Sequence, residues 1–195
     1  VVDKAAFKVG SEDEINLKEK PKFVGRGGLK LEGGLDAFGI DVTGLVGMDI
    51  GSSTGGFTDC LLQRGAVKIF AFDVGTNQLA FKLRQDPRVR IREQFNARHL
   101  TYDDVGEFVG IVVIDVSFIS LLHVLRPAID LMAPDSHAVC LIKPQFELGK
   151  DRVGKGGIVR NSDDHEDAVA KIRSFVEESD RLSWEGLIES PIKGC

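Results

Sequence analysis

Short apolar runs alternate with amphipathic segments along most of the chain. The apolar runs predict strands at about 45–50, 67–73, 88–92, 110–115 and 137–142. The amphipathic segments predict helices near 55–65, 76–85 and 118–133, and a further helix is expected to begin at Ser162. Strands that are separated by helices require crossover connections, which produce parallel pairing. The pattern therefore predicts an α/β fold with a mostly parallel sheet and helices on both faces.

The two ends of the chain have a different pattern. Residues 1–20 alternate apolar and polar side chains around Gly10, which predicts a small hairpin. A polar loop is expected over 143–161, followed by the helix from Ser162 and a last strand near 182–189. Before the first strand, a short amphipathic helix is expected to open at the glycine pair 27–28, with an apolar face made of Leu29, Leu31, Leu35 and Phe38.

Composition narrows the class of protein. The chain has 195 residues, of which 43% are apolar, so one domain with a sizeable core is expected. No apolar run approaches ~20 residues and the N-terminus lacks the pattern of a signal peptide, so we expect a cytoplasmic protein without a membrane partner. The three cysteines and four histidines lack metal-ligand spacing, which predicts no metal site. A net charge of −5 argues against a surface that is basic throughout, but it allows a local basic face.

The segment from Val46 to Asp59 carries the first candidate chemistry. An apolar run, a glycine-containing turn and an amphipathic segment follow one another, as at the ligand loop of nucleotide-binding α/β folds. Compared with the dinucleotide pattern G-x-G-x-x-G, Gly51 is followed by Ser53 at the second glycine position, and the glycine pair 55–56 comes late. The loop therefore favours a smaller adenosyl ligand over a pyrophosphate. A tight turn that binds nothing is the alternative.

Charged residues follow three of the predicted strands, at the sheet edge where such folds bind ligands. Asp73 comes about 20 residues after Gly51, where an acidic residue typically binds ribose hydroxyls, although a solvated carboxylate is the alternative. Asp115 follows the fourth strand and Lys143 the fifth, and we expect these strands to be neighbours. A lysine beside an aspartate, both after apolar runs, favours chemistry that depends on perturbed titration. An ion pair that only closes the sheet edge is the alternative.

Several longer motifs resemble one family. They are GRGGLKLE at 25–32, DIGSSTGGFTDCL at 49–61, IDVSFIS at 114–120, KPQFE at 143–147 and VGKGGIVR at 153–160. In this order they look like the TlyA family, whose members were named hemolysins and include ribosomal RNA 2′-O-methyltransferases related to the FtsJ-type enzymes. The resemblance runs from about Lys22 to Gly194.

The resemblance implies a Rossmann-like fold that transfers a methyl group from S-adenosylmethionine to a ribose 2′-hydroxyl. The family uses a Lys-Asp-Lys-Glu tetrad, of which Lys30, Asp115 and Lys143 match the first three members. A hydroxyl is a poor nucleophile, so a base must take its proton, and a lysine can do so only when its neutral form is favoured. Lys143 is the expected base, Lys30 the cation that favours its neutral form and steers the ribose, and Asp115 the residue that orients both lysines near the cofactor methyl.

The resemblance also implies the binding residues and partners. The expected S-adenosylmethionine site comprises Asp49, Gly51, Ser52, Ser53, Thr54, Gly55, Gly56, Phe57, Asp73, Val74, Asn96 and Asp115. The expected partner is ribosomal RNA or a ribosomal subunit. Spaced cations can follow a phosphate backbone, although a solvated loop is the alternative. The expected RNA-binding residues are Arg26, Lys150, Arg152, Lys155 and Arg160.

Two departures from the family concern the ends. The glutamate of the tetrad has no match before Cys195, and the final antiparallel strand of the fold would also follow that residue. Residues 1–20 resemble only the closing hairpin of the family's RNA-binding module. We therefore interpret 1–20 as a remnant of that module with its linker, and 21–195 as a methyltransferase domain that lacks its last strand. The alternatives are a nicotinamide-binding oxidoreductase, a non-catalytic RNA-binding protein and a hemolysin-like protein.

Overall fold

A computed structural model of the chain describes Gly10 and residues 21–192. The expected hairpin and module remnant at 1–20 therefore lie outside the described residues, except for Gly10. They remain predictions, as does the proposed division into domains.

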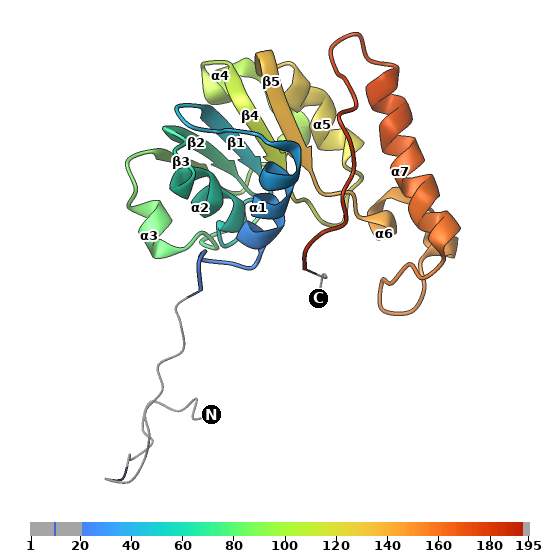
Figure 1. The fold of residues 1–195 in the computed structure, drawn as a ribbon. Coiled ribbons are helices and arrows are strands. Elements are labelled where there is room, and N and C mark those ends of the chain that lie inside the picture. The colour runs from blue at the N-terminus through green and yellow to red at the C-terminus, as the bar shows by residue number, and fades with distance from the viewer. Residues whose placement is uncertain (1–9, 11–20, 193–195) are drawn as a thin grey trace.

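Five parallel strands form the single sheet of the described residues, in the order β3-β2-β1-β4-β5 (Figure 1). The strands are β1 Val46–Ile50, β2 Lys68–Phe72, β3 Val89–Arg92, β4 Val109–Ile114 and β5 Met132–Cys140. All five agree with the predicted apolar runs, although β5 begins earlier than expected. Its first residue, Met132, pairs with Val109, and a register shift separates that pair from the one at Ile111.

Helices cover both faces of the sheet, as predicted, and the alternation of side chains along each strand explains why. Ile111 and Val113 of β4 are buried in the core cluster that α1 (Gly27–Phe38) and α2 (Gly56–Gln63) help to form. Val112 and Ile114 are buried in a second cluster, with residues of α5 (Leu122–Ile129) and α7 (Ser162–Glu177). A parallel strand that is buried on both faces is apolar at consecutive positions, which is why β4 reads as an unbroken apolar run.

Some helices differ from the expected bounds. The helix predicted at 76–85 is reduced to α3, Phe81–Arg84, and that predicted at 118–133 to α5. Phe118 adopts φ +65°, which is incompatible with a helix start at that position. The predicted loop 143–161 contains α6, Pro144–Glu147, and the short η2, Lys150–Arg152. Two further short elements were not predicted: η1 at Ala97–His99 and α4 at Tyr102–Val105.

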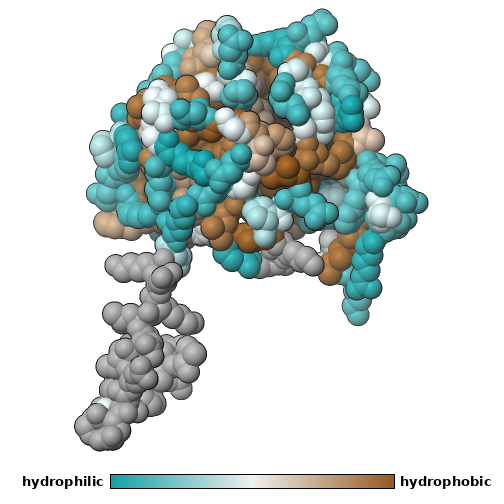
Figure 2. All heavy atoms as spheres, in the orientation of Figure 1, coloured by the Kyte–Doolittle hydropathy of each residue, from teal (hydrophilic) through white to brown (hydrophobic). Residues whose placement is uncertain are grey.

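The strand predicted near 182–189 is wrong. Residues 182–189 contain no strand, although β5 pairs only with β4 within residues 21–192 and its other edge is open. Two apolar residues of this segment, Leu182 and Trp184, instead pack against the core cluster on the α5 side. Leu187 and Ile188 are exposed, and Figure 2 shows apolar surface gathered between α1 and α7, where this segment runs in Figure 1. The segment then follows α1, with Pro191 next to Gly33.

No helix of the described residues is both long and apolar enough to cross a membrane.

The ends of β1 and β4 approach each other closely at Gly51. This residue has φ +85°, and a Cβ atom there would lie 2.5 Å from the Asp115 carbonyl oxygen. Gly106 is a natural control because it also has a left-handed φ, +77°, but a Cβ atom there would meet nothing within 4 Å.

We predict that Gly51→Ala lowers the free energy of unfolding by about 1–3 kcal/mol more than Gly106→Ala does, because only the first adds a backbone clash to the strained φ. Chemical denaturation of both variants and the wild type measures the difference. Equal losses would show that the β1 and β4 ends can separate without cost.

Candidate active site

The loop from Gly51 to Gly55 folds tightly between β1 and α2. The amides of Gly51 and Ser52 both donate to the Phe72 carbonyl of β2, at 2.9 and 3.1 Å. The Gly55 amide donates to the Ser52 carbonyl at 2.7 Å. Gly55 has φ +95°, which strains any larger residue, and a Cβ atom there would lie 2.3 Å from Leu83 Cδ1, so that side chain would have to shift.

A cavity of about 220 Å³ opens between this loop, the start of α1 and the end of β4. Backbone and small polar side chains form most of its wall. It is lined by Arg26, Gly27, Lys30, Gly51, Ser52, Ser53, Thr54, Gly56, Phe57, Asp115 and Ile192. Most of the loop residues expected to bind a cofactor therefore face one cavity.

Three charged side chains from different elements meet beside the cavity. The Lys30 ammonium on α1 lies 3.4 Å from Asp115 Oδ2 at the end of β4. The Lys143 ammonium at the end of β5 contacts Asp115 Oδ1 and donates a hydrogen bond to Ser117 Oγ at 3.0 Å. The Lys143–Oδ1 contact is an ion pair outside hydrogen-bonding geometry. The three charged side chains are only 18–20% exposed, and two ammonium groups share one carboxylate, so the cluster carries a net positive charge.

The structure thus brings together the three residues to which the family resemblance assigns catalysis. They come from positions far apart in the sequence. The parallel order of β4 and β5 places Asp115 and Lys143 at the same edge, and α1 packs across that edge with Lys30. Lys30 and Asp115 line the cavity. Lys143 does not line it but contacts Asp115.

Asp49 lies beneath the loop, 1% exposed, and does not line the cavity. Its Oδ2 accepts hydrogen bonds from the amide and hydroxyl of Thr58, at 2.9 and 2.6 Å, while its buried Oδ1 has no partner. Burial raises the pKa of Asp49 to about 7, the negative charges of Asp115 and Asp73 add to this, and the Thr58 hydrogen bonds oppose it. Through its hydrogen bonds with Thr58, Asp49 connects the start of α2 to β1.

The other residues expected at the cofactor site lie outside the cavity lining. Asp73 at the end of β2 accepts hydrogen bonds from the amides of Ser53 and Gly75, both at 2.7 Å. Val74 is 74% exposed. Asn96 caps η1, because its Oδ1 accepts a hydrogen bond from the Arg98 amide at 3.1 Å. For all three, a direct ligand contact stays a prediction.

The cations expected to bind RNA have different settings. Arg26 lines the cavity, and Lys150 begins η2. Arg152 forms ion pairs with Asp164 and Asp167 of α7, so its charge is already balanced within the protein. The two remaining cations are exposed in the loop before α7: Lys155 and Arg160.

Sequence reasoning missed several residues around the charged cluster. Phe118 is 91% exposed, and its ring centroid lies 5.3 Å from that of Phe146. The Lys143 ammonium lies 6.0 Å from the Phe146 ring centroid. Glu147, which ends the KPQFE motif, is buried. Each of these residues stands within four positions of Asp115 or Lys143, and that proximity was the available signal.

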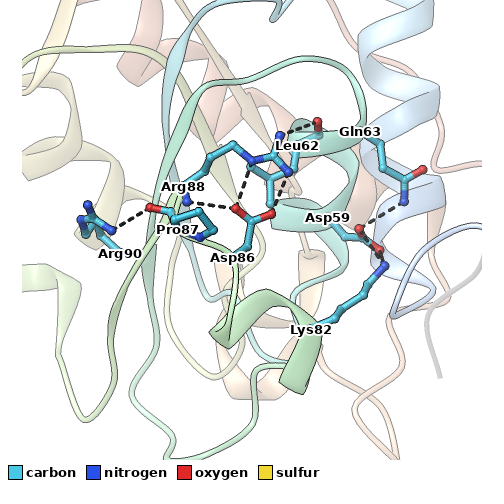
Figure 3. A network of polar contacts seen from close by, with 8 residues as sticks. All are labelled: Asp59, Leu62, Gln63, Lys82, Asp86, Pro87, Arg88 and Arg90. Atoms are coloured by element: carbon cyan, nitrogen blue, oxygen red, sulfur yellow. Dashed lines mark hydrogen bonds and ion pairs between the residues drawn. The ribbon is translucent and has the colours of Figure 1, made fainter.

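A second hollow, of about 210 Å³, lies between α2 and α3. Figure 3 shows that its charged groups are paired within the protein: Lys82 with Asp59 at 3.0 Å, and Arg88 with Asp86 at 2.7 Å. Asp59 also accepts a hydrogen bond from the Val24 amide at 2.8 Å, which ties the segment before α1 to α2. These pairs account for the arrangement of the charges without a ligand.

Among the described residues, no group of His, Cys, Asp or Glu side chains is arranged to hold a metal ion.

Comparison with known proteins identifies relatives along the whole described chain. Residues 23–194 match the FtsJ-like methyltransferase family. The chain is 45% identical, over 88% of its length and 64% of the relative's, to the 16S/23S rRNA (cytidine-2′-O)-methyltransferase TlyA of Mycobacterium tuberculosis. It is 44% identical, over 82% of its length and 67% of the relative's, to Hemolysin A of Brachyspira hyodysenteriae. The chain thus spans about two thirds of the length of these relatives.

A solved structure gives the same picture. The chain superposes on a crystal structure from Lactococcus lactis, described as a "putative hemolysin", with a TM-score of 0.85 and 45% identity. The match covers 90% of this chain and 84% of that one.

Asp49 generates a pH-dependence that can be measured. Its pKa of about 7 in the folded protein lies above the ordinary value of about 3.9. The folded protein therefore keeps a proton that the unfolded chain releases as pH rises above about 4. The free energy of unfolding falls as pH rises from about 4 to 7, and the loss persists above that window.

We predict that Asp49→Asn removes this loss, which amounts to roughly 4 kcal/mol between pH 4 and pH 8. Urea denaturation of the wild type and the variant at both pH values measures it, and the difference between the two proteins cancels the contribution of other groups. Parallel pH dependence in the two proteins would show that Asp49 is ionised at low pH despite its burial.

Proposed function

We propose that this chain, which belongs to the FtsJ-like methyltransferase family, transfers a methyl group from S-adenosylmethionine to a ribose 2′-hydroxyl of ribosomal RNA. The observation that carries the proposal is the convergence of Lys30, Asp115 and Lys143 at the rim of a glycine-bounded cavity. The relative from Mycobacterium tuberculosis, by its name, methylates cytidine riboses of 16S and 23S rRNA.

The residues around the cavity suit S-adenosylmethionine. Backbone of the glycine loop and the hydroxyls of Ser53 and Thr54 offer donors for a polar ligand, and the Asp115 carboxylate offers a negative charge for a sulfonium group. At about 220 Å³ the cavity is smaller than the 300–1,000 Å³ typical of drug-sized ligands, so it encloses only part of such a cofactor. The Asp73 carboxylate stands on the other side of Ser53 and is the candidate contact for the ribose of the cofactor.

When bound, S-adenosylmethionine supplies an electrophilic methyl group. Lys143, in its neutral form, takes the proton of the ribose 2′-hydroxyl as the oxygen bonds to the methyl carbon and the carbon–sulfur bond breaks. Asp115 holds Lys143 and Lys30 on its two oxygens, which fixes both nitrogen atoms relative to the cavity. The positive charge of Lys30 attracts the RNA phosphates.

Phe118 supports a nucleic acid as the substrate. Its left-handed backbone, φ +65°, has a cost in free energy and is typical of functional sites, and its side chain is 91% exposed and so can contact another molecule. It stands three residues from Asp115 and is backed by Phe146, so it can stack against a base that is turned out of its helix.

The other functions have less support. A nicotinamide cofactor would place its pyrophosphate on the loop, where Ser53 replaces the second glycine of the dinucleotide pattern. A non-catalytic RNA-binding protein leaves the Lys30–Asp115–Lys143 cluster without a use. The name of the Brachyspira relative raises membrane lysis, but no observation on the described residues favours it.

We predict that Lys143→Met, in the full-length protein, lowers methyl transfer to ribosomal RNA by roughly 100-fold or more while the dissociation constant for S-adenosylmethionine stays within about twofold. The reason is that Lys143 acts on the hydroxyl and does not line the cavity. Calorimetric titration and transfer of a labelled methyl group measure the two quantities. Lys68→Met is the control and keeps its activity, because Lys68 pairs with Glu107 at the start of β2, at the opposite end of the sheet from the site. Full transfer by Lys143→Met would remove Lys143 from the role of base, and binding of NAD in place of S-adenosylmethionine would overturn the proposed function itself.

We predict that Phe118→Ala lowers kcat/KM for RNA by about 10-fold, since a stacked base contributes roughly 1–3 kcal/mol. Affinity for S-adenosylmethionine is expected to stay unchanged. Phe81→Ala, which removes a 77% exposed phenylalanine on α3, is the matched control. Steady-state kinetics on ribosomal RNA gives both values, and an equal effect of the two substitutions would deny Phe118 a role in substrate binding.

A further inference from the structure

We propose that Glu147 is a positioning residue for the methyl-transfer site. Its buried carboxylate joins the loop that carries Asp115 to the turn that carries Lys143, and it thereby sets the distance between these two side chains. This inference rests on the proposed function, because it concerns the geometry of the same site.

The Glu147 carboxylate has a complete set of partners although its side chain is only 2% exposed. Oε1 accepts a hydrogen bond from the Leu121 amide at 2.7 Å, and Oε2 accepts one from Ser120 Oγ at 2.6 Å. Lys171 of α7 donates to Oε2 at 3.0 Å and to the Glu147 carbonyl at 2.8 Å. A buried ionised carboxylate is costly unless it is paired and hydrogen-bonded, and here both conditions are met.

On one side, Glu147 is rigidly connected to Lys143. The two residues are the ends of the single turn that contains α6, and the Phe146 amide donates to the Lys143 carbonyl at 2.9 Å. Pro144 at the start of α6 fixes one backbone angle of the turn. A displacement of Glu147 by an ångström would therefore be passed to the Lys143 backbone.

On the other side, Ser120 and Leu121 end the loop that starts at Asp115. Leu121 precedes α5, and no side chain of that helix start caps it. The Glu147 carboxylate supplies the missing acceptor, and its negative charge is favourable at a helix N-terminus. Between Asp115 and Ser120 the backbone passes through the left-handed Phe118, a conformation that persists only when both ends of the loop are held.

The sheet itself cannot hold the two side chains in place. The hydrogen bond from the Leu141 amide to the Ile114 carbonyl, 2.9 Å, lies on the strand side of both functional residues. Beyond it, Lys143 is tied to the β4 loop by its own side chain, through Asp115 and Ser117. Those contacts involve the nitrogen atom that takes the proton, so they change during the reaction. The contacts of Glu147 involve neither residue, so they can maintain the spacing throughout the reaction.

Glu147→Gln in the full-length protein tests the inference. Glutamine keeps the shape, but its NH₂ group cannot accept the bonds from both Ser120 and Lys171. We expect kcat for methyl transfer to fall about 10- to 100-fold, the range in which a misplacement of about 1 Å acts, with KM for RNA and the affinity for S-adenosylmethionine unchanged. We also expect the midpoint of the pH profile of kcat to move, because the surroundings of Lys143 change.

Glu177→Gln is the matched control, because Glu177 forms an exposed ion pair with Arg173 on α7. It should leave kcat and the pH profile unchanged. A role in stability alone would lower the unfolding midpoint of Glu147→Gln while kcat per S-adenosylmethionine-binding site and the pH midpoint stay at the wild-type values, and that result would overturn the inference.

Ser120→Ala provides a second, milder variant that removes one hydrogen bond from the loop side. We expect a loss in kcat of roughly three- to tenfold, and a folded Ser120→Ala protein with full kcat and an unmoved pH midpoint would overturn the inference even where Glu147→Gln does not fold. Failure of the wild type to transfer a methyl group would instead refute the proposed function, so the two failures are distinguishable.

Discussion

The parallel order of β1, β4 and β5 is the constraint on which the candidate site depends. Because all strands run in the same direction, the residues that follow them gather at the carboxyl end of the sheet. These residues lie beyond the last hydrogen bonds between the strands. The β1 loop, Asp115 and Lys143 come together for this reason alone. The helix α1, packed on the β5 side of the same edge, adds Lys30. The β1 loop, the start of α1 and Asp115 thereby line one cavity, and Lys143 contacts Asp115 beside it.

The two carboxyl groups near this end of the sheet have different partners. Asp115 lies between two lysines and is largely buried, whereas Asp49, on the neighbouring strand β1, is buried with one oxygen unpartnered. Neither arrangement contributes as much to stability as apolar packing would. The two apolar clusters on the faces of the sheet supply that stability, so the edge can hold groups that are selected for chemistry. In our proposal, Glu147 connects the loop that carries Asp115 to the turn that carries Lys143, beyond the last hydrogen bond between β4 and β5.

Much of this arrangement could be predicted from the sequence. Strands that are buried on both faces leave continuous apolar runs, so all five strands were found, and the meeting of Asp115 with Lys143 follows from strand order. The segment 182–189 misled, because apolar residues that pack on a core can have the same pattern as a strand, and periodicity alone does not distinguish the two. Asp73, Asn96 and Glu147 each accept a hydrogen bond from a backbone amide of a loop or turn. These hydrogen bonds depend on loop geometry, which the periodicity of the sequence does not encode.

The proposed reaction at this site is methylation of a ribose hydroxyl. A methyl group on the 2′-oxygen prevents cleavage of the adjacent phosphodiester bond by alkali, because that oxygen can no longer attack the phosphorus. The most direct measurement is therefore to incubate the full-length protein with ribosomal RNA and methyl-labelled S-adenosylmethionine, digest the RNA completely with alkali, and separate the products by length. The account predicts label in alkali-resistant dinucleotides. Label in mononucleotides would place the methyl group on a base and contradict it.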